Sequence, residues 1–288
     1  MKQRTLLWLA ALLAVVCVVA GGVYWWQQQP AVPVPAVPVG AAPAPAPAAV
    51  APSAPAEPAV RHPIEPETAA SAPASQPRPL PPADQADTYV ADALSELLGR
   101  KAVLGFLSTD RFAARLVATV DNLDRPHAAA RLWPVNPMPA RFVTSAAADG
   151  TLIGADNAKR YAPFVQFIAS ANTAQTVALY RRLYPLFQQA YEELGYPGKY
   201  FNDRVVQVID HLLQTPEPAG PLKVRLTEVK GPVASTTPWL RYEYEDPALE
   251  ARSAGQKMLL RTGAAHTRQL KAKLAEVRTL IARGDSKR

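Results

Sequence analysis

The chain has 288 residues, 30 of them proline, and a formal net charge of +7 at pH 7. Because Cys17 is its single cysteine, an internal disulfide is excluded, and any folded part must be stabilised by packing. The sequence contains no P-loop, GxGxxG, HExxH or CxxC pattern, which argues against a nucleotide-dependent enzyme and against a zinc enzyme.

Residues 6–26 form an uncharged apolar run, LLWLAALLAVVCVVAGGVYWW, which predicts a transmembrane helix. A helix of this length rises ~32 Å, close to the ~30 Å hydrocarbon core of a bilayer. The run ends in Tyr24, Trp25 and Trp26, aromatic residues that are typical of a membrane interface. A cleaved signal peptide is the alternative interpretation, although its apolar part would be long and Val18 fits the cleavage site poorly.

The basic residues around this run are distributed unevenly. Lys2 and Arg4 precede it, and no basic residue follows it until Arg61. The positive-inside rule therefore predicts residues 1–5 in the cytoplasm and everything after residue 27 across the membrane. With this topology we expect no nucleic-acid partner.

Residues 27–83 predict a disordered spacer rich in proline and alanine. The segment 30–82 holds 17 of the 30 prolines, no aromatic residue and only two basic residues. Such a composition buries too little apolar surface to offset the entropy of ordering the chain, so we expect the spacer to stay extended and solvated. The alternative is a PxxP-type ligand for a groove-bearing partner.

Residues 84–288, 205 in all, predict one mainly α-helical domain that contains a small antiparallel β-hairpin. Apolar residues spaced three and four apart predict its helices. The first helix is expected at 86–98 and ends at Gly99. A second helix, capped by Ser108 or Thr109, is expected to carry Phe112, Leu116, Val117 and Val120. Two more are expected at 174–194, with a kink at Pro185, and at 201–213. A weak hairpin is expected within 141–153.

Alternating apolar and polar residues predict two strands, 222–227 and 240–245. A shift of their pairing by one residue would place charged side chains opposite apolar ones. We therefore expect one antiparallel register, with the pairs Lys223–Glu245, Val224–Tyr244, Arg225–Glu243 and Leu226–Tyr242.

Asp246 and Pro247 form a cap and a favoured first-turn residue, which predicts a helix that continues to Arg261 and ends at Gly263. A last helix is expected to carry an apolar stripe of Leu270, Leu274, Val277 and Ile281. Residues 252–288 hold ten basic and two acidic residues, a net charge of +8. A basic surface is predicted on this last helix, consisting of Arg268, Lys271, Arg278 and Arg283. It either meets anionic lipid, an acidic polymer or an acidic protein, or it only solvates a helix that packs on its own domain.

The run Tyr200-Phe201-Asn202-Asp203-Arg204 is the strongest candidate for a functional patch. In the structural interpretation Asn202 caps the helix, Asp203 complements its dipole and Phe201 packs inward. In the functional interpretation an interaction patch consists of Tyr200, Asp203, Arg204 and His211. No catalytic, cofactor-binding or metal-binding residue is predicted, because adjacent helical residues such as Asp210 and His211 point about 100° apart and no GxSxG turn is present.

Three stretches of the sequence resemble those of one protein family: VATVDNL (117–123), LYRRLYPLFQQAYEELGYPGKYFNDRVVQVIDHLLQTP (179–216) and YEYEDPALEARSAGQKMLLRTG (242–263). The chain resembles the proteobacterial domain-of-unknown-function family 3014 over most of residues 84–283. The resemblance implies an inner-membrane protein of a Gram-negative bacterium with its domain in the periplasm. It implies no activity.

These patterns together predict a single-pass inner-membrane protein that contacts the bilayer through residues 6–26. We expect it to function as a non-enzymatic interaction or scaffold protein in cell-envelope assembly or maintenance. We expect an envelope protein as its partner and no cofactor. One alternative is a peptidoglycan-directed enzyme or binding module, so enzymatic activity stays open. Another is an energy-coupling protein with a proline-rich spacer, although such proteins end in a smaller αβ domain.

Overall fold

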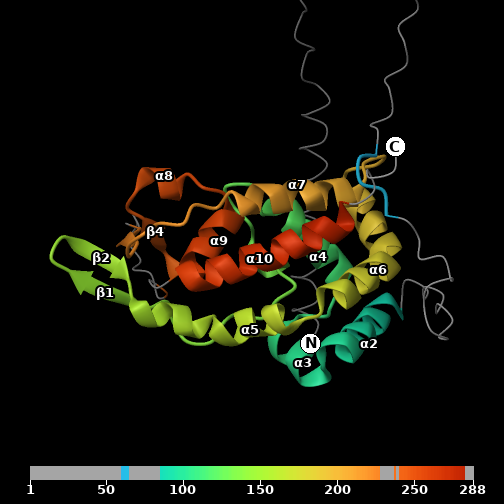
Figure 1. Ribbon diagram of the computed structural model, residues 1–288, viewed down its shortest axis with the longest axis horizontal. Coiled ribbons are helices and arrows are strands. Elements are labelled where there is room, and N and C mark those ends of the chain that lie inside the picture. Colours follow the sequence, from blue (N-terminus) through green and yellow to red (C-terminus); the bar gives the residue numbers. More distant parts are fainter. Residues whose placement is uncertain (1–59, 65–84, 228–236, 238–239, 283–288) are drawn as a thin grey trace, which may run out of the picture. The chain divides into compact units, whose positions relative to one another are not determined.

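The computed structural model describes residues 60–64, 85–227, 237 and 240–282 (Figure 1). The predicted membrane span at 6–26 and most of the predicted spacer at 27–83 lie outside the described residues. Among the residues that are described, no helix has both the length and the apolar character needed to cross a bilayer. The domain is mainly helical with a four-stranded antiparallel sheet, so the predicted fold class is confirmed for the helices and the sheet is larger than the hairpin expected.

The first helix, α2, spans Ala86–Leu98 and ends at Gly99, as predicted. Gly99 has a φ of 86°, a conformation that glycine adopts at little cost. A short helix that the sequence did not predict, α3 (Arg100–Phe106), follows directly and packs against α2.

Helix α4 (Phe112–Asn122) begins with a cap that comes from another helix. The predicted caps Ser108 and Thr109 are wrong. Instead the backbone N–H groups of Arg111 and Phe112 donate to the carboxylate of Asp87 in α2, at 2.8 and 3.3 Å. A carboxylate satisfies the free N–H groups of a helix start and complements the helix dipole, whichever part of the chain supplies it.

The middle of the domain contains α5 (Ala162–Ser170), α6 (Thr173–Glu193) and α7 (Phe201–Leu213), with the short 3-10 helices η2 (Ala130–Leu132) and η3 (Ala155–Arg160) before them. Helix α6 continues through Pro185, which confirms the prediction of a single helix. The boundaries predicted for α7 are confirmed as well.

Four strands form one sheet in the order β1-β2-β3-β4: Thr144–Ala147, Gly150–Ile153, Lys223–Leu226 and Tyr242–Tyr244. The predicted register of β3 and β4 is confirmed, because Val224 pairs with Tyr244, Arg225 with Glu243 and Leu226 with Tyr242. The pairing of β2 with β3 was not predicted. The ammonium of Lys223 binds Asp149 in the β1–β2 turn, which ties the two hairpins together.

The chain after the sheet forms α8 (Pro247–Glu250), α9 (Ala254–Thr262) and α10 (Ala264–Ile281). Asp246 caps α8 as predicted, but the prediction of one helix up to Arg261 is wrong. The interruption lets α9 begin against the end of α4, where the N–H groups of Ala254 and Gly255 donate to the carbonyl oxygens of Arg125 and Leu123 at 2.7 and 2.8 Å.

Helix α7 lies among the other helices, with α4, α6 and α10 packed against it (Figure 1). It supplies Phe201 to the largest hydrophobic cluster, which includes α2, α4 and α6. Its Val206 and Ile209 contact the end of α10, and Val208 and Leu212 contact α9. Because the apolar stripe of α10 is used in these clusters, this basic helix packs on its own domain.

We expect Gly255→Ala to destabilise the domain, because a Cβ at this position would lie 2.6 Å from the Cδ2 of Leu212 and 2.8 Å from the carbonyl oxygen of Leu123. Overpacking of this kind costs about 1–3 kcal/mol of unfolding free energy, measurable by urea denaturation. Gly105→Ala in α3 is the matched control, since nothing lies within 4 Å of its added Cβ and alanine favours a helix. Equal stability of the two variants would contradict the close contact of α9 with α4 and α7.

Candidate functional site

One mostly polar stripe along α7 and its two ends lines a polar hollow of about 890 Å³, which we call the α7 groove. The stripe repeats at helical spacing and consists of Tyr200, Asp203, Arg204, Gln207, Asp210, His211 and Gln214. Other parts of the chain add Asp121, Arg125, Tyr191, Tyr196, Lys199, Arg61 and His62. The structure thus brings all four residues of the predicted interaction patch into the lining of one groove.

The floor of the groove is an ion cluster between the end of α4 and α7, centred on the buried Asp121. The carboxylate of Asp121, which is only 3% exposed, accepts hydrogen bonds from Arg204 Nε at 3.0 Å, from Arg125 Nη2 at 2.5 Å and from the Tyr196 hydroxyl at 3.1 Å. Arg204 also donates to both carboxylate oxygens of Asp124, at 2.7 Å each. Such a two-pronged pairing fixes the orientation of the guanidinium as well as its position.

Electrostatics in this cluster favour the charged form of Arg204. Burial alone would lower the pKa of its guanidinium, but hydrogen bonds and charges from Asp124 and Asp121 outweigh this effect and raise the pKa above its ordinary value. Burial and the nearby Asp121 carboxylate raise the pKa of Tyr191, so that its hydroxyl stays protonated.

Sequence reasoning missed Asp121, Asp124 and Arg125. One signal was present: Asp121 follows Val117 by four residues, so a carboxylate shares the helix face of a fully buried valine. A carboxylate on a buried stripe requires a cationic partner, but the pattern does not reveal that Arg204, 83 residues further on, supplies it.

Residues 60–64, which we call the strap, lie against the start of α7 and the end of α10 (Figure 1). The N–H groups of Arg61 and His62 donate to the Asp203 carboxylate at 3.0 and 2.7 Å, and the N–H of Ile64 donates to the Tyr200 hydroxyl at 2.6 Å. Val60, Arg61 and Pro63 are exposed, as expected for a solvated spacer, but the contacts of the strap with α7 were not predicted. The backbone N–H groups of the strap bind polar side chains of α7, and Ile64 packs on the largest hydrophobic cluster. Composition alone does not indicate these contacts.

Asn202 does not cap α7, so the structural interpretation of this residue is wrong. The first N–H groups of α7 donate instead to α6 side chains, Phe201 to Gln188 and Asn202 to the Tyr184 hydroxyl, at 2.9 and 3.1 Å. The Asn202 side chain is fully buried. Its amide donates to the carbonyl oxygens of His62 and Ile281 at 2.8 and 3.1 Å, and it accepts from the Tyr180 hydroxyl at 3.1 Å.

The far end of the groove contains Asp210 and His211. Asp210 pairs with Arg278 of α10, and His211 Nε2 lies 2.9 Å from the hydroxyl oxygen of Ser253. Ser253 is only 6% exposed and caps α9 by accepting from Gln256 N, so this serine–histidine contact stabilises a helix start and offers no accessible nucleophile.

The predicted basic surface of α10 is divided among different partners. Lys271 donates to Glu217 and to the carbonyl oxygen of Thr215, at 2.8 and 3.0 Å, and Arg278 is taken by Asp210. Arg268 is exposed, and Arg283 lies outside the described residues. Two of the three described cations are thus held by the domain itself.

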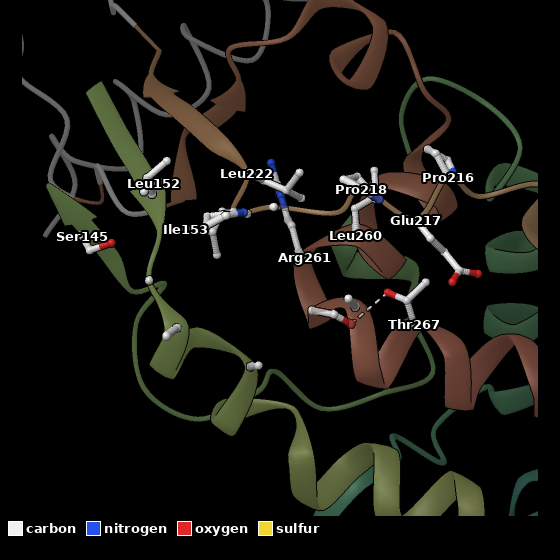
Figure 2. A pocket seen from close by; sticks show the side chains of 17 residues that line it. Ser145, Leu152, Ile153, Pro216, Glu217, Pro218, Leu222, Leu260, Arg261 and Thr267 are labelled. Atoms are coloured by element: carbon white, nitrogen blue, oxygen red, sulfur yellow. Dashed lines mark hydrogen bonds between the residues drawn. The ribbon is translucent and has the colours of Figure 1, made fainter. Parts of the chain in front are cut away.

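A second hollow, of about 320 Å³, is mostly apolar and lies between the sheet and the α9–α10 junction (Figure 2). Leu152, Ile153, Leu222 and Leu260 line it together with the prolines of the loop 216–221. Arg261 Nη2 donates to the carbonyl oxygen of Tyr242 at 2.6 Å, while Arg261 Nε is buried and has no hydrogen-bond partner among the described residues. Thr267 donates to the carbonyl oxygen of Gly263 at 3.0 Å. This hollow is large enough for a small apolar group, but it gathers no chemically reactive set of side chains.

Within the residues that the structure describes, no three histidine, cysteine, aspartate or glutamate side chains gather in a way that would hold a metal ion. The domain is therefore a mainly helical module with a small sheet, whose most polar hollow is built along one helix. The sequence model of one family, described as Protein of unknown function (DUF3014), matches residues 112–278, more than half of the chain, and the chain belongs to this family. The resemblance seen in the sequence is confirmed. No curated protein and no solved structure matches the chain.

We expect Asn202→Ala to cost about 3 kcal/mol of unfolding free energy, because it leaves the carbonyl oxygens of His62 and Ile281 and the hydroxyl of Tyr180 without their partner. Asn172→Ala is the matched control, since Asn172 is a simple cap that accepts from Gln175 N and should cost about 1 kcal/mol. Urea denaturation compares the two variants. A loss for Asn202 no greater than that for Asn172 would contradict its role as a connection between segments.

Proposed function

We propose that this chain is a single-pass inner-membrane protein whose domain lies in the periplasm and serves as a non-enzymatic interaction module in cell-envelope assembly or maintenance. The membrane attachment is supported by the apolar run 6–26 and by the basic residues Lys2 and Arg4 before it. The α7 groove is the proposed partner-binding surface.

The observation that carries this proposal is the docking of the strap at one end of the groove. Asp203, Tyr200 and Asn202 bind four backbone groups of a non-helical segment that bends at Arg61 and His62, and backbone contacts of this kind are also used by protein grooves that recognise peptides. The groove continues beyond the strap along α7, past Gln207 to Gln214, and both of these side chains are exposed. A surface that already binds the backbone of one non-helical segment suits a second segment from a partner.

A non-enzymatic role is supported by the state of the titratable groups in the groove. Each of the three carboxylates that line it has a structural partner: Asp121 binds arginines, Asp203 binds the strap and Asp210 binds Arg278. General acid–base catalysis requires a side chain that is free to exchange a proton with a substrate.

A peptidoglycan-binding module is the second candidate, and one observation favours it. Tyr191 and Tyr196 stack with ring centroids 4.6 Å apart, and Lys199 lies over the Tyr196 ring at 5.1 Å. Tyr191 is only 4% exposed, so the ring available to a ligand is that of Tyr196, and a partly exposed aromatic ring in a polar groove also suits a sugar.

Topology is tested by a reporter fused behind Arg288. We expect alkaline phosphatase, which is active only after export, to be active in this fusion and a cytoplasmic fluorescent reporter to be dark, because the positive-inside rule exports the C-terminal part. Cell fractionation should recover the full-length chain with the inner membrane. A fluorescent fusion in the cytoplasm, or a mature chain that lacks its first residues, would contradict the proposed topology.

Partner binding is tested by photocrosslinking in intact cells from a photoreactive residue at Gln207 in the groove. We expect discrete adducts with envelope proteins, because Gln207 is exposed on the free stripe of α7. The matched control is position Lys101, which is exposed on α3 and does not line the groove. Adducts with glycan strands only would favour the peptidoglycan-binding module, and equal adducts from both positions would contradict the groove as the binding surface.

A further inference from the structure

We infer that the α7 groove binds an extended acidic peptide segment of a partner protein. The inference rests on the proposed function, because it specifies the chemistry of the partner at the same surface. It follows from the charged side chains in the lining, from the side chains that bind the backbone of the strap, and from the length of the stripe beyond the strap.

The acidic groups of the groove are saturated. Both oxygens of Asp203 accept backbone N–H groups of the strap, at 3.0 and 2.7 Å. Asp121 accepts hydrogen bonds from Arg204, Arg125 and Tyr196, and the Asp210 carboxylate is held by Arg278. A cationic ligand would have to displace one of these partners, so the groove offers it no free anion.

Two cations at the rim are unsaturated. Arg61 is exposed and contributes its backbone N–H to the strap contact, but its guanidinium makes no ion pair with any described residue. The ammonium of Lys199 lies over the Tyr196 ring and pairs with no carboxylate in the described part of the chain. The lining holds four cations (Arg61, Arg125, Lys199 and Arg204) and three carboxylates (Asp121, Asp203 and Asp210), so the net charge that the groove presents to a ligand is positive.

The shape of the groove favours a peptide over a compact anion. The strap contacts only the first turn of the stripe, at Tyr200 and Asp203. From Asp203 to Gln214 the rest of the stripe rises ~17 Å, which an extended chain covers with about five residues. Gln207 and Gln214 are exposed along this path. The Gln207 amide oxygen accepts from Arg204 at 3.2 Å, and its NH₂ group can donate to a peptide carbonyl, while the Gln214 amide can both donate and accept. In addition, the Nδ1 atom of His62 is buried and lacks a hydrogen-bond partner among the described residues, at the point where strap and groove meet.

The experiment measures fluorescence anisotropy of a labelled alternating Glu-Ala peptide of about six residues, titrated with the detergent-solubilised full-length chain. The matched probe is a Gln-Ala peptide of the same length. We expect the acidic peptide to bind at least about fivefold more tightly, which corresponds to about 1 kcal/mol for exposed ion pairs. Raising the salt concentration should weaken the binding of the acidic peptide only. Equal binding of both peptides, or no binding of either, would overturn the inference.

Variants place the binding in the groove. Lys199→Glu and Arg61→Glu should each lower the affinity for the acidic peptide by about fivefold. Lys101→Glu on α3 makes the same charge change outside the groove and should leave the affinity within about twofold. Both groove side chains are exposed, so unfolding curves should stay unchanged. Equal effects of all three variants would mean attraction by net charge alone and would overturn the inference.

Two further results separate this inference from the proposed function. If crosslinks from Gln207 reach envelope proteins but the acidic peptide fails to bind, the interaction function stands and the acidic chemistry is wrong. If vesicles of phosphatidylglycerol compete with the peptide and their binding is lost in Lys199→Glu, the groove recognises lipid headgroups, which also overturns a peptide partner.

Discussion

Helix α7 contributes to three separate hydrophobic clusters, and this burial determines which of its side chains are available for binding. Phe201 enters the cluster of α2, α4 and α6, while Val206 and Ile209 meet α10 and Leu212 meets α9. A helix packed on three sides leaves one stripe for polar residues, because burying an unpaired charge is costly. The groove is therefore a consequence of core packing, and its position along α7 cannot shift without breaking that packing.

The buried pair of Asp121 and Arg204 holds α4 in place beneath the groove. Breaking such a pair by removing one partner typically costs about 3–5 kcal/mol, since the other charge stays buried without compensation. The pair therefore sets which residues of α4 and α7 face each other, although hydrophobic contacts supply most of the folding free energy. Because Arg125 and Tyr196 also bind Asp121, the same carboxylate orients two more groups of the groove lining.

Asn202 joins parts of the chain that are far apart in sequence. Its side chain binds the strap through His62, α10 through Ile281 and α6 through Tyr180. Burial raises the pKa of the Tyr180 and Tyr184 hydroxyls, so both remain protonated donors at this junction. The strap thus enters the domain at the same place where the last helix ends, and a ligand in the neighbouring groove would contact both the strap and α7.

Local patterns in the sequence determined the limits of α2 and α7, the passage of α6 through Pro185 and the register of β3 with β4, because apolar periodicity and turn residues act over a few neighbours. They also brought Tyr200, Asp203, Arg204 and His211 onto one helix face. Only the tertiary structure decided that Asp87 caps α4, that the helix after Asp246 breaks before Ala254, that Asp121 pairs with Arg204 and that the strap binds Asp203. Each of these features depends on groups that are far apart in the sequence. Such groups attract each other only after the helices have packed, so a local sequence pattern does not predict their contact.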